Sequence, residues 1–522
     1  MNALLPLFFV GPLLAAAVSL LVGSTRVRWS LGLAAPVLVL AGGLALIGAT
    51  RDGSVVVAQV AGWPGGVAIP FVADTLSALL LTMTGILVLA GMVFARAAGH
   101  GADPLFPPLA LMMTAGVYGA YLTADLFNLF VMIEVALLPS YVLMARSGTA
   151  AALSAARLYL TVNLCASTLF LAGVGAVYGT AGTVNLAALA GQGVRPSVAV
   201  AVGVVLIALA VKGALVPVHT WLPATYPHAT PAVSALFSGL LTKVGVYALI
   251  RVGTMVFEPG PAVSAAVLGA AVLSMVVGVL GALGEATIRG VLSFHMVSQV
   301  GYILVGLGLG GTAGLAAMVF FMLQYSVVKT SLFLTGGAVE VRCGTGAIAD
   351  LGGVARERFW VGVAFLIGAL SLTGLPPFSG FWGKWGLLDV ALTEGRPVVF
   401  TVALLVSLGT MASMLKLGVG VFWGERPQPG GSGEPEPEPA RRGPTVAGAP
   451  GSTRSGGMVV TAAARPEVTT RGSSAALVAP GLLLAVLGLA VGLHPEPLIA
   501  LAEVAGATLD DPSAYVTGVL GR

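Results

Sequence analysis

Residues 197–222 read SVAVAVGVVLIALAVKGALVPVHTWL, an apolar run that is long enough to cross a bilayer and contains a single lysine, Lys212. A helix rises about 1.5 Å per residue, so about 20 apolar residues span a hydrocarbon core about 30 Å thick. Similar runs recur along the whole 522-residue chain. Hydrophobic residues make up 57% of the chain and charged residues 9%, whereas soluble domains are about 25% charged. The sequence therefore predicts an all-α polytopic membrane protein and excludes a water-soluble fold.

Gly, Pro and charged residues divide the apolar runs into about fourteen predicted membrane helices. We expect helices 1–3 in residues 1–105, helices 4–8 in 106–254, helices 9–13 in 262–424, a loop in 425–471, and the last helix with a C-terminal tail in 472–522. The loop contains GEPEPEPARRGPTVAGAP, whose composition cannot bury enough apolar surface to become ordered. We predict that this loop is disordered and cytoplasmic.

The basic residues are sorted by type along the chain. With the N-terminus outside, fifteen arginines fall on the inner side and five, including Arg251, on the outer side. The positive-inside rule therefore places both termini on the outer face. All twenty arginines are assigned to loops or helix ends, whereas the five lysines all fall inside predicted helices: Lys212, Lys243, Lys329, Lys384 and Lys416.

Lysine at membrane depth has a specific chemical use. Burial away from water favours the neutral form of lysine, so such a group can exchange a proton under physiological conditions. We interpret four lysines as proton carriers because they lie in mid-helix: Lys212, Lys243, Lys329 and Lys384. The alternative is an ammonium group that reaches the headgroups or forms a static pair, and we favour it for Lys416, near a helix end.

The acidic partner that the sequence offers is Glu134, within ADLFNLFVMIEVALLPSYVL at 124–143. A lysine about 6 Å away would attract it by about 3 kcal/mol at an effective dielectric near 20. Protonation of one group would then decide whether the other keeps its proton, although a static ion pair would give the same sequence pattern. Asp74 and Asp125 each open a predicted helix and are predicted to be N-caps.

Prolines interrupt two predicted helices close to a lysine. Pro217 follows Lys212 in the seventh helix, and Pro377 precedes Lys384 in the twelfth. Proline removes a backbone donor, and free backbone groups at membrane depth are tolerated only inside protein or along a wet cavity. Two broken helices, five segments apart, predict repeated halves with an ion path in each.

The histidines point to two further candidate positions. His295 lies in the tenth helix beside a polar strip, where it is either a relay member or a satisfied core histidine. His219 and His228 flank the turn between the seventh and eighth helices, where they form a candidate gate or are simply solvated. We predict no metal site and no cofactor, because neither histidines nor cysteines have ligand spacing, and no nucleic-acid partner, because the basic residues are dispersed.

Five segments together resemble a known family. They are DLFNLFVMIEVALLPSYVL, KGALVPVHTWLPATYPHATPAVSALFSGLLTKVGVYALIR, LSFHMVSQVGYILVGLG, VVKTSLFLTGG and LTGLPPFSGFWGKW. Between about residues 70 and 425, in this order, the chain is similar to the proton-translocating membrane subunits shared by Mrp-type multisubunit Na+/H+ antiporters and respiratory complex I. Within that family it most resembles the D-type subunits of the Mrp antiporters.

The resemblance implies fourteen helices, with 106–254 and 262–424 as two inverted five-helix, antiporter-like repeats. It also implies proton-translocating roles for the residues that match the family's ionisable positions, namely Glu134, Lys212, Lys243, Lys329 and Lys384. Many relatives carry a histidine four residues before the lysine that matches Lys329, and here that position is Tyr325. This departure makes His295 a stronger candidate for a member of the proton relay. The 425–471 loop has no counterpart in the family pattern.

We therefore expect a proton-translocating subunit of a multisubunit cation/proton antiporter, a transporter and not an enzyme. The implied partners are the other subunits, the lipid bilayer, H+ and Na+, with Li+ or K+ as other candidate cations, in a bacterial-type plasma membrane. One alternative is a proton-pumping subunit of a redox-driven complex, of the complex I or membrane hydrogenase type. Another is a passive scaffold that holds active subunits in the membrane.

Overall fold

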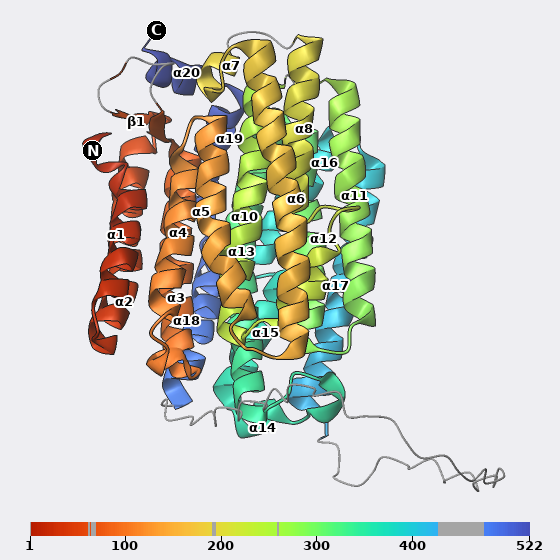
Figure 1. The fold of residues 1–522 in the computed structure, drawn as a ribbon. Coiled ribbons are helices and arrows are strands. Elements are labelled where there is room, and N and C mark those ends of the chain that lie inside the picture. The colour runs from red at the N-terminus through yellow and green to blue at the C-terminus, as the bar shows by residue number, and fades with distance from the viewer. Residues whose placement is uncertain are drawn as a thin grey trace, which may run out of the picture.

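The computed structural model describes residues 2–60, 63, 69–190, 195–257, 260–425 and 474–521. Long helices run side by side in a single bundle, with α1 (Leu7–Leu21) and α2 (Thr25–Thr50) at one edge (Figure 1). We call the end that holds β1 (Val56–Gln59) the β1 end, and the opposite end, which holds α14 (Val354–Glu357), the α14 end. Both ends of the described chain lie at the β1 end. That the β1 end lies on the outer face of the membrane remains a prediction.

The remaining elements follow in chain order. The first part contains η1 (Asn2–Leu4), β2 (Pro70–Ala73), α3 (Thr75–Ala97), η3 (His100–Ala102), α4 (Phe106–Leu122), α5 (Leu126–Ala145), α6 (Ala150–Ala181), α7 (Leu186–Ala190), α8 (Pro196–Lys212), α9 (Trp221–Thr225), η4 (Tyr226–His228) and α10 (Pro231–Val256). The second part contains α11 (Pro261–Gly284), α12 (Ile288–Leu309), α13 (Gly311–Cys343), η5 (Ile348–Asp350), α15 (Phe359–Thr373), α16 (Ser379–Thr393), α17 (Pro397–Leu417), the π-helix η6 (Gly418–Trp423), α18 (Ser474–Leu493), α19 (Glu496–Asp510) and α20 (Ser513–Leu520).

The predicted class of an all-α polytopic membrane protein is confirmed. Within the described residues, eleven helices are long and apolar enough to cross a membrane. Both predicted breaks are present, because the chain leaves the helical conformation between α8 and α9 and again between α15 and α16. The count of fourteen, the domain boundaries and the inverted relation of the two repeats stay predictions. The predicted disorder of the 425–471 loop falls, except for Glu425, outside the described residues.

Two local features differ from what we expected. The region assigned to helices 1–3 also contains an antiparallel hairpin in which Val56 pairs with Ala73 and Gln59 with Pro70. The predicted C-terminal tail instead forms α19, which packs against α13, and α20, which packs against α7 and β1. Both features are too short or too amphipathic to produce the uniform apolar run by which we recognised membrane helices.

The helices begin and pack as their residues dictate. The Asp74 carboxylate accepts a hydrogen bond from the Ser77 N–H (2.9 Å), and Asp125 accepts one from the Asn128 N–H (2.8 Å), which confirms both predicted N-caps. At Gly116, α4 lies so close to α5 that a Cβ atom would overlap the α5 backbone. Small residues allow such close approach between membrane helices.

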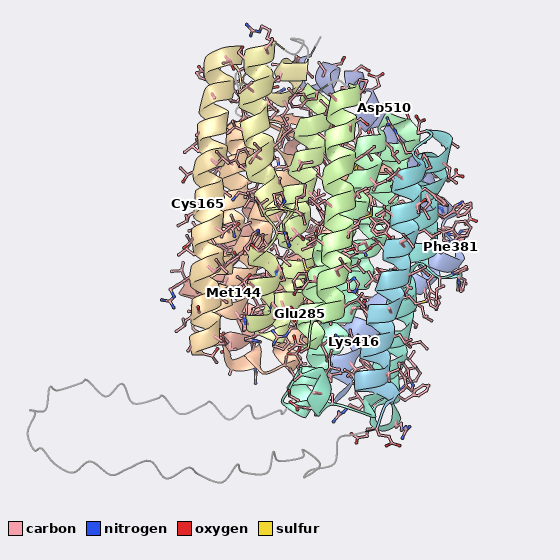
Figure 2. The ribbon with its side chains drawn as sticks, turned by 90° about the vertical axis from the view of Figure 1, so that its right-hand side faces the viewer. Met144, Cys165, Glu285, Phe381, Lys416 and Asp510 are labelled. Carbon is pink, nitrogen blue, oxygen red and sulfur yellow. The ribbon has the colours of Figure 1, made fainter. Side chains whose placement is uncertain are left out.

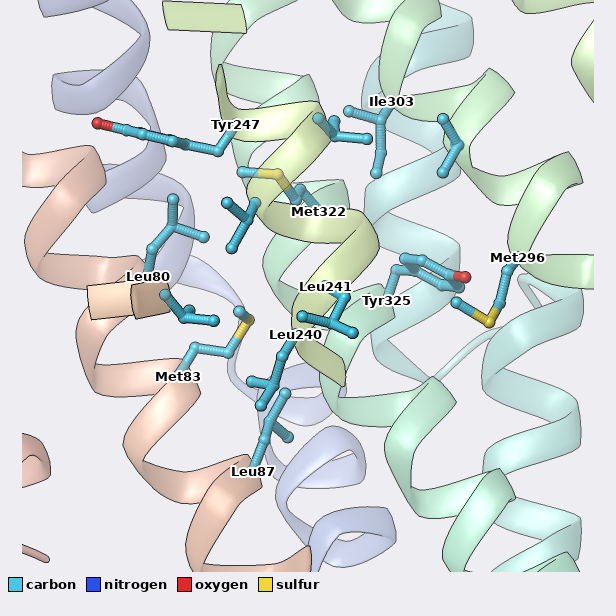
Figure 3. Close-up of a cluster of buried hydrophobic side chains, with 14 of the residues drawn as sticks. Leu80, Met83, Leu87, Leu240, Leu241, Tyr247, Met296, Ile303, Met322 and Tyr325 are labelled. Atoms are coloured by element: carbon cyan, nitrogen blue, oxygen red, sulfur yellow. The ribbon is translucent and has the colours of Figure 1, made fainter. Parts of the chain in front are cut away.

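The centre of the bundle is a continuous hydrophobic core. Figure 3 shows side chains of α3, α10, α12 and α13 meeting there, including Leu80, Leu240, Met296 and Met322. The innermost helix is α10, and the 18-residue apolar segment that qualifies it as a membrane span is completely buried. Lys243 on α10 and Lys329 on α13 are 1% and 0% exposed, so both are surrounded by protein and not by lipid.

Candidate functional site: a row of buried ionisable groups

The first cluster joins α5, α6 and α8. The Lys212 Nζ lies 3.5 Å from the Glu134 Oε1 and donates a hydrogen bond to the Ser167 hydroxyl (2.8 Å), which in turn donates to Glu134. Lys212 is the last residue of α8, directly before the break, and its side chain is 4% exposed, against 21% for Glu134. The acid and the lysine that we predicted to interact are thus in contact, with a hydroxyl between them that the sequence analysis did not identify.

A small cavity of about 20 Å³ continues from this cluster toward α10. Lys212, Tyr159, Asn163 and Trp221 line it together with apolar side chains of α5 and α10. A cavity of that size has room for about one water molecule, and Lys212 and Asn163 offer polar groups to bind it. The cavity therefore lies between the Lys212 ammonium and the helix that carries Lys243.

The second cluster lies between α10 and α13. Lys243 donates a hydrogen bond to the Ser238 carbonyl, and its Nζ lies 4.5 Å from the centre of the Tyr325 ring. Lys329, one turn further along α13, is fully buried, and its Nζ has no hydrogen-bond partner among the described residues. Tyr325 meets Lys243 through its ring face, an arrangement that stabilises a cation.

The third cluster joins α12, α16 and α17. The Lys384 Nζ donates to the Thr373 carbonyl (3.0 Å) and to the Ser407 hydroxyl (3.1 Å), and it lies 4.9 Å from the centre of the Tyr302 ring. The His295 Nε2 lies 2.6 Å from the Ser413 Oγ, and its Nδ1 has no hydrogen-bond partner among the described residues. Thr373 is the last residue of α15, so Lys384 binds a carbonyl at the second break.

The remaining predicted residues are placed less centrally. His219 lies in the break between α8 and α9 and is largely buried, whereas His228 is exposed at the end of η4, on the other side of α9. Lys416 donates hydrogen bonds to the carbonyls of Leu283 (2.9 Å) and Glu285 at the end of α11. For Lys416 we favoured an ammonium group that reaches the headgroups or pairs with a carboxylate; the contact found is with backbone carbonyls instead.

Arg251 corrects the sorting of basic residues by type. We assigned it to a loop or helix end, but it lies within α10, is 1% exposed and forms a 2.5 Å ion pair with Asp74, also 1% exposed. Its guanidinium carbon lies 5.0 Å from the centre of the Tyr515 ring of α20. The assignment of all arginines to loops or helix ends was wrong for Arg251. It lies near the end of a long apolar stretch, and a buried counter-charge cannot be recognised there from sequence.

The serines and threonines that bind the ionisable groups were also missed. Ser167, Ser407 and Ser413 lie in apolar helices, where an isolated hydroxyl usually bonds to its own backbone. Only the packing of the helices shows that each of these hydroxyls faces a charged or titratable side chain. The described residues contain no group of three or more His, Cys, Asp and Glu side chains able to hold a metal ion.

The fold and this row of groups define a class of protein. A helical membrane bundle that holds a glutamate, four lysines and a histidine at depth has the composition of an ion transporter, because such groups are costly in a membrane unless they serve transport. The chain belongs to the family described as NADH:quinone oxidoreductase/Mrp antiporter, TM, whose model matches residues 123–411.

Known relatives support this assignment over most of the chain. The D-type Na(+)/H(+) antiporter subunit of Alkalihalophilus pseudofirmus is 37% identical over 379 residues, which are 71% of this chain and 77% of that protein. The protein of the same name from Bacillus subtilis is 30% identical over 88% of both chains. A chain in the structure of the Mrp complex from a Dietzia species matches with a TM-score of 0.89 and 44% identity, over 100% of this chain and 99% of that one.

Proposed function

We propose that this chain is the proton-translocating membrane subunit of a multisubunit cation/proton antiporter, a transporter and not an enzyme. The observation that carries the proposal is the contact between Glu134 and Lys212, with Ser167 between them, at the break of α8. The relatives from Alkalihalophilus and Bacillus are both named as Na(+)/H(+) antiporter subunits, which supports the same function.

Glu134 and Lys212 act as a charge-switch pair. At 3.5 Å the two charges attract each other by about 5 kcal/mol at an effective dielectric near 20. When Glu134 takes up a proton this attraction disappears, and the buried Lys212 then releases its own proton more readily. The Ser167 hydroxyl both donates and accepts hydrogen bonds, so it passes the proton between the two groups.

The following lysines continue the relay by mutual repulsion. Lys243 and Lys329 are buried without a carboxylate partner among the described contacts, so charging both at once is unfavourable. A proton that reaches Lys243 therefore favours release further along the row, at Lys329 or His295 and then at Lys384. Lys384, at the second break, connects to the opposite side of the membrane from Glu134. His219, at the first break, and His228 are the candidate gate residues.

The driving force is the proton gradient. Protons move inward through this subunit and drive Na+ outward, with Li+ or K+ as further candidate cations. The cation path lies in the neighbouring subunits, which are the partners of this chain. We place the protein in a bacterial plasma membrane with both termini on the outer face, because fifteen of twenty arginines were counted on the inner side.

The redox-driven complex remains the second candidate, because the matched family includes NADH:quinone oxidoreductase subunits. Absorbance of flavin or iron–sulfur groups in the purified complex distinguishes the two candidates. The names of the relatives favour the antiporter.

The proposal is tested in inside-out vesicles from antiporter-deficient cells that express the subunit with its natural neighbours. Respiration builds a pH gradient, a Na+ pulse is added, and a pH dye reports its collapse. We expect exchange in the wild type and none in Glu134→Gln at equal amounts of assembled complex. Glu503→Gln, which changes an exposed glutamate of α19, is the matched control and should retain exchange. Exchange retained in Glu134→Gln would remove Glu134 from the mechanism and favour the passive scaffold.

A further inference from the structure

Two cross-helix contacts join α12 and α17 at different heights. At one height the Tyr302 hydroxyl lies 2.8 Å from the Ser407 Oγ, which also accepts a hydrogen bond from Lys384. At the other, the His295 ring nitrogen Nε2 lies 2.6 Å from the Ser413 Oγ. His295 and Tyr302 are two turns apart on α12, so about 10 Å separates the two contacts along the helix axis.

Between the two contacts lies a buried amide without partners. Gln299 is four residues after His295 and three before Tyr302, so it lies on the same face of α12 as both. It is 1% exposed, and neither its Oε1 nor its Nε2 has a hydrogen-bond partner among the described residues. Thr410 holds the corresponding middle position on α17, three residues from both Ser407 and Ser413, and is also buried. Its hydroxyl donates to the Val406 carbonyl (2.9 Å), so its oxygen can still accept a hydrogen bond from water.

A buried amide that binds nothing is costly, because it loses its hydrogen bonds to water without replacement. An amide is satisfied in protein interiors by another polar group or by an ordered water. His295 adds a further unpartnered atom, since its Nδ1 is also buried without a partner among the described residues. Three unpartnered polar atoms on one helix face, between two contacts that already carry titratable groups, favour water at this place.

We infer that Gln299 and Thr410 bind water between α12 and α17, and that this water conducts protons between Lys384 and His295. In this route Lys329 passes the proton to Lys384, and the path then runs through Ser407 and the water to His295 and Ser413. It continues toward the α14 end, where Lys416 lies one turn beyond Ser413 and near Glu285 (Figure 2). The inference rests on the proposed function, and it adds Ser407, Gln299, Thr410 and Ser413 as residues of the path.

The direction of the path fits the packing of α17. Ser407, Thr410, Ser413 and Lys416 are spaced by three residues, so each step advances about 4.5 Å and turns back by about 60° around the helix. The stripe therefore faces Lys384 of α16 first, then His295 of α12, and finally the end of α11. One helix thus contacts all three groups in order.

Two variants of the whole complex test the water site. Gln299→Met keeps the shape of the side chain but removes its hydrogen-bonding atoms, and Ser413→Ala removes the hydroxyl that contacts His295. We expect each to slow Na+-driven exchange by about a hundredfold, the lower end of the range for loss of a proton-transfer group. Ser326→Ala is the control and should leave exchange unchanged, because within the described part of the chain this buried hydroxyl bonds to the Met322 carbonyl of its own helix alone.

Thermal stability gives a second, independent readout. If the site holds water, Gln299→Met loses those hydrogen bonds and the melting temperature of the complex falls or stays constant. A rise in melting temperature would mean that the amide is dry, and it would overturn the inference. Should Gln299→Met fail to assemble, the exchange rate of Ser413→Ala decides.

Failure of the inference is distinct from failure of the proposed function. If Glu134→Gln abolishes exchange while Gln299→Met and Ser413→Ala retain it, protons take another route from Lys384 and the antiporter function stands. If Glu134→Gln retains exchange, Glu134 is removed from the mechanism and the proposed relay through this chain is wrong.

Discussion

Asp74→Asn would leave the Arg251 guanidinium buried without its counter-charge. The two groups form a 2.5 Å ion pair, and both side chains are 1% exposed. Removing one partner of a buried pair costs about 3–5 kcal/mol, because the remaining charge is left desolvated. This corresponds to more than a hundredfold shift in the folding equilibrium. We expect Asp74→Asn to lower sharply the fraction of complex that survives heating in detergent, measured by size-exclusion chromatography.

A second acidic residue provides the matched control. Asp103 forms a 2.6 Å pair with Arg146, but the Arg146 side chain is 27% exposed. Burial raises the pKa of Asp103, but hydrogen bonds from His100, Leu105 and Arg146 outweigh it and lower the pKa from 3.8 to about 2. Asp103 is therefore ionised at neutral pH. The Asp103–Arg146 pair is partly open to solvent, with 13% and 27% exposed side chains, so Asp103→Asn should cost less stability than Asp74→Asn.

A double variant completes the test. Asp74→Asn combined with Arg251→Met removes both charges and should recover much of the stability lost in Asp74→Asn alone, since no unpaired charge remains. The reasoning is refuted if Asp74→Asn is as mild as Asp103→Asn, or if the double variant is no more stable than the single one.

Three further predictions follow from the packing and the caps. Gly116→Val should abolish assembly, because its side chain would overlap the α5 backbone. Gly175→Val is the control and should assemble normally on a native gel, because no atom lies within 4 Å of a Cβ atom at that position. Tyr325→Phe should retain exchange in vesicles because the ring that faces Lys243 remains, and Tyr325→Leu should lower it; equal rates would contradict a role for the ring. Asp125→Ala removes the cap of α5 and should cost about 1 kcal/mol in thermal stability; no change would show that the cap is dispensable.

The sequence predicts the membrane fold and the main ionisable groups because both depend on local composition. Lysines are rare in apolar helices, so Lys212, Lys243, Lys329 and Lys384 could be identified one by one, and all four are buried. The contact between Glu134 and Lys212 was expected as a pair, but its 3.5 Å geometry and Ser167 depend on how three helices pack.

What the sequence could not predict depends on contacts between distant segments. Arg251 was assigned to a loop or helix end, and its buried pairing could not be foreseen because its counter-charge, Asp74, is 177 residues away. The partners of Ser407 and Ser413 are likewise set by the crossing of α17 over α12 and α16, and no local pattern encodes that crossing.

The contacts of α20 with Arg251 and with β1 have a consequence for the order in which the protein is synthesised. Tyr515 of α20 covers the Arg251 guanidinium, and the Gln59 side chain donates to the Val519 carbonyl, across 460 residues. Asp74 and Arg251 thus enter the membrane long before the ribosome has made the residues that cover them. Until then the Asp74–Arg251 ion pair lacks the Tyr515 ring that covers it in the finished structure. The contacts of α20 with Arg251 and β1 therefore form only after the membrane helices between them have been made.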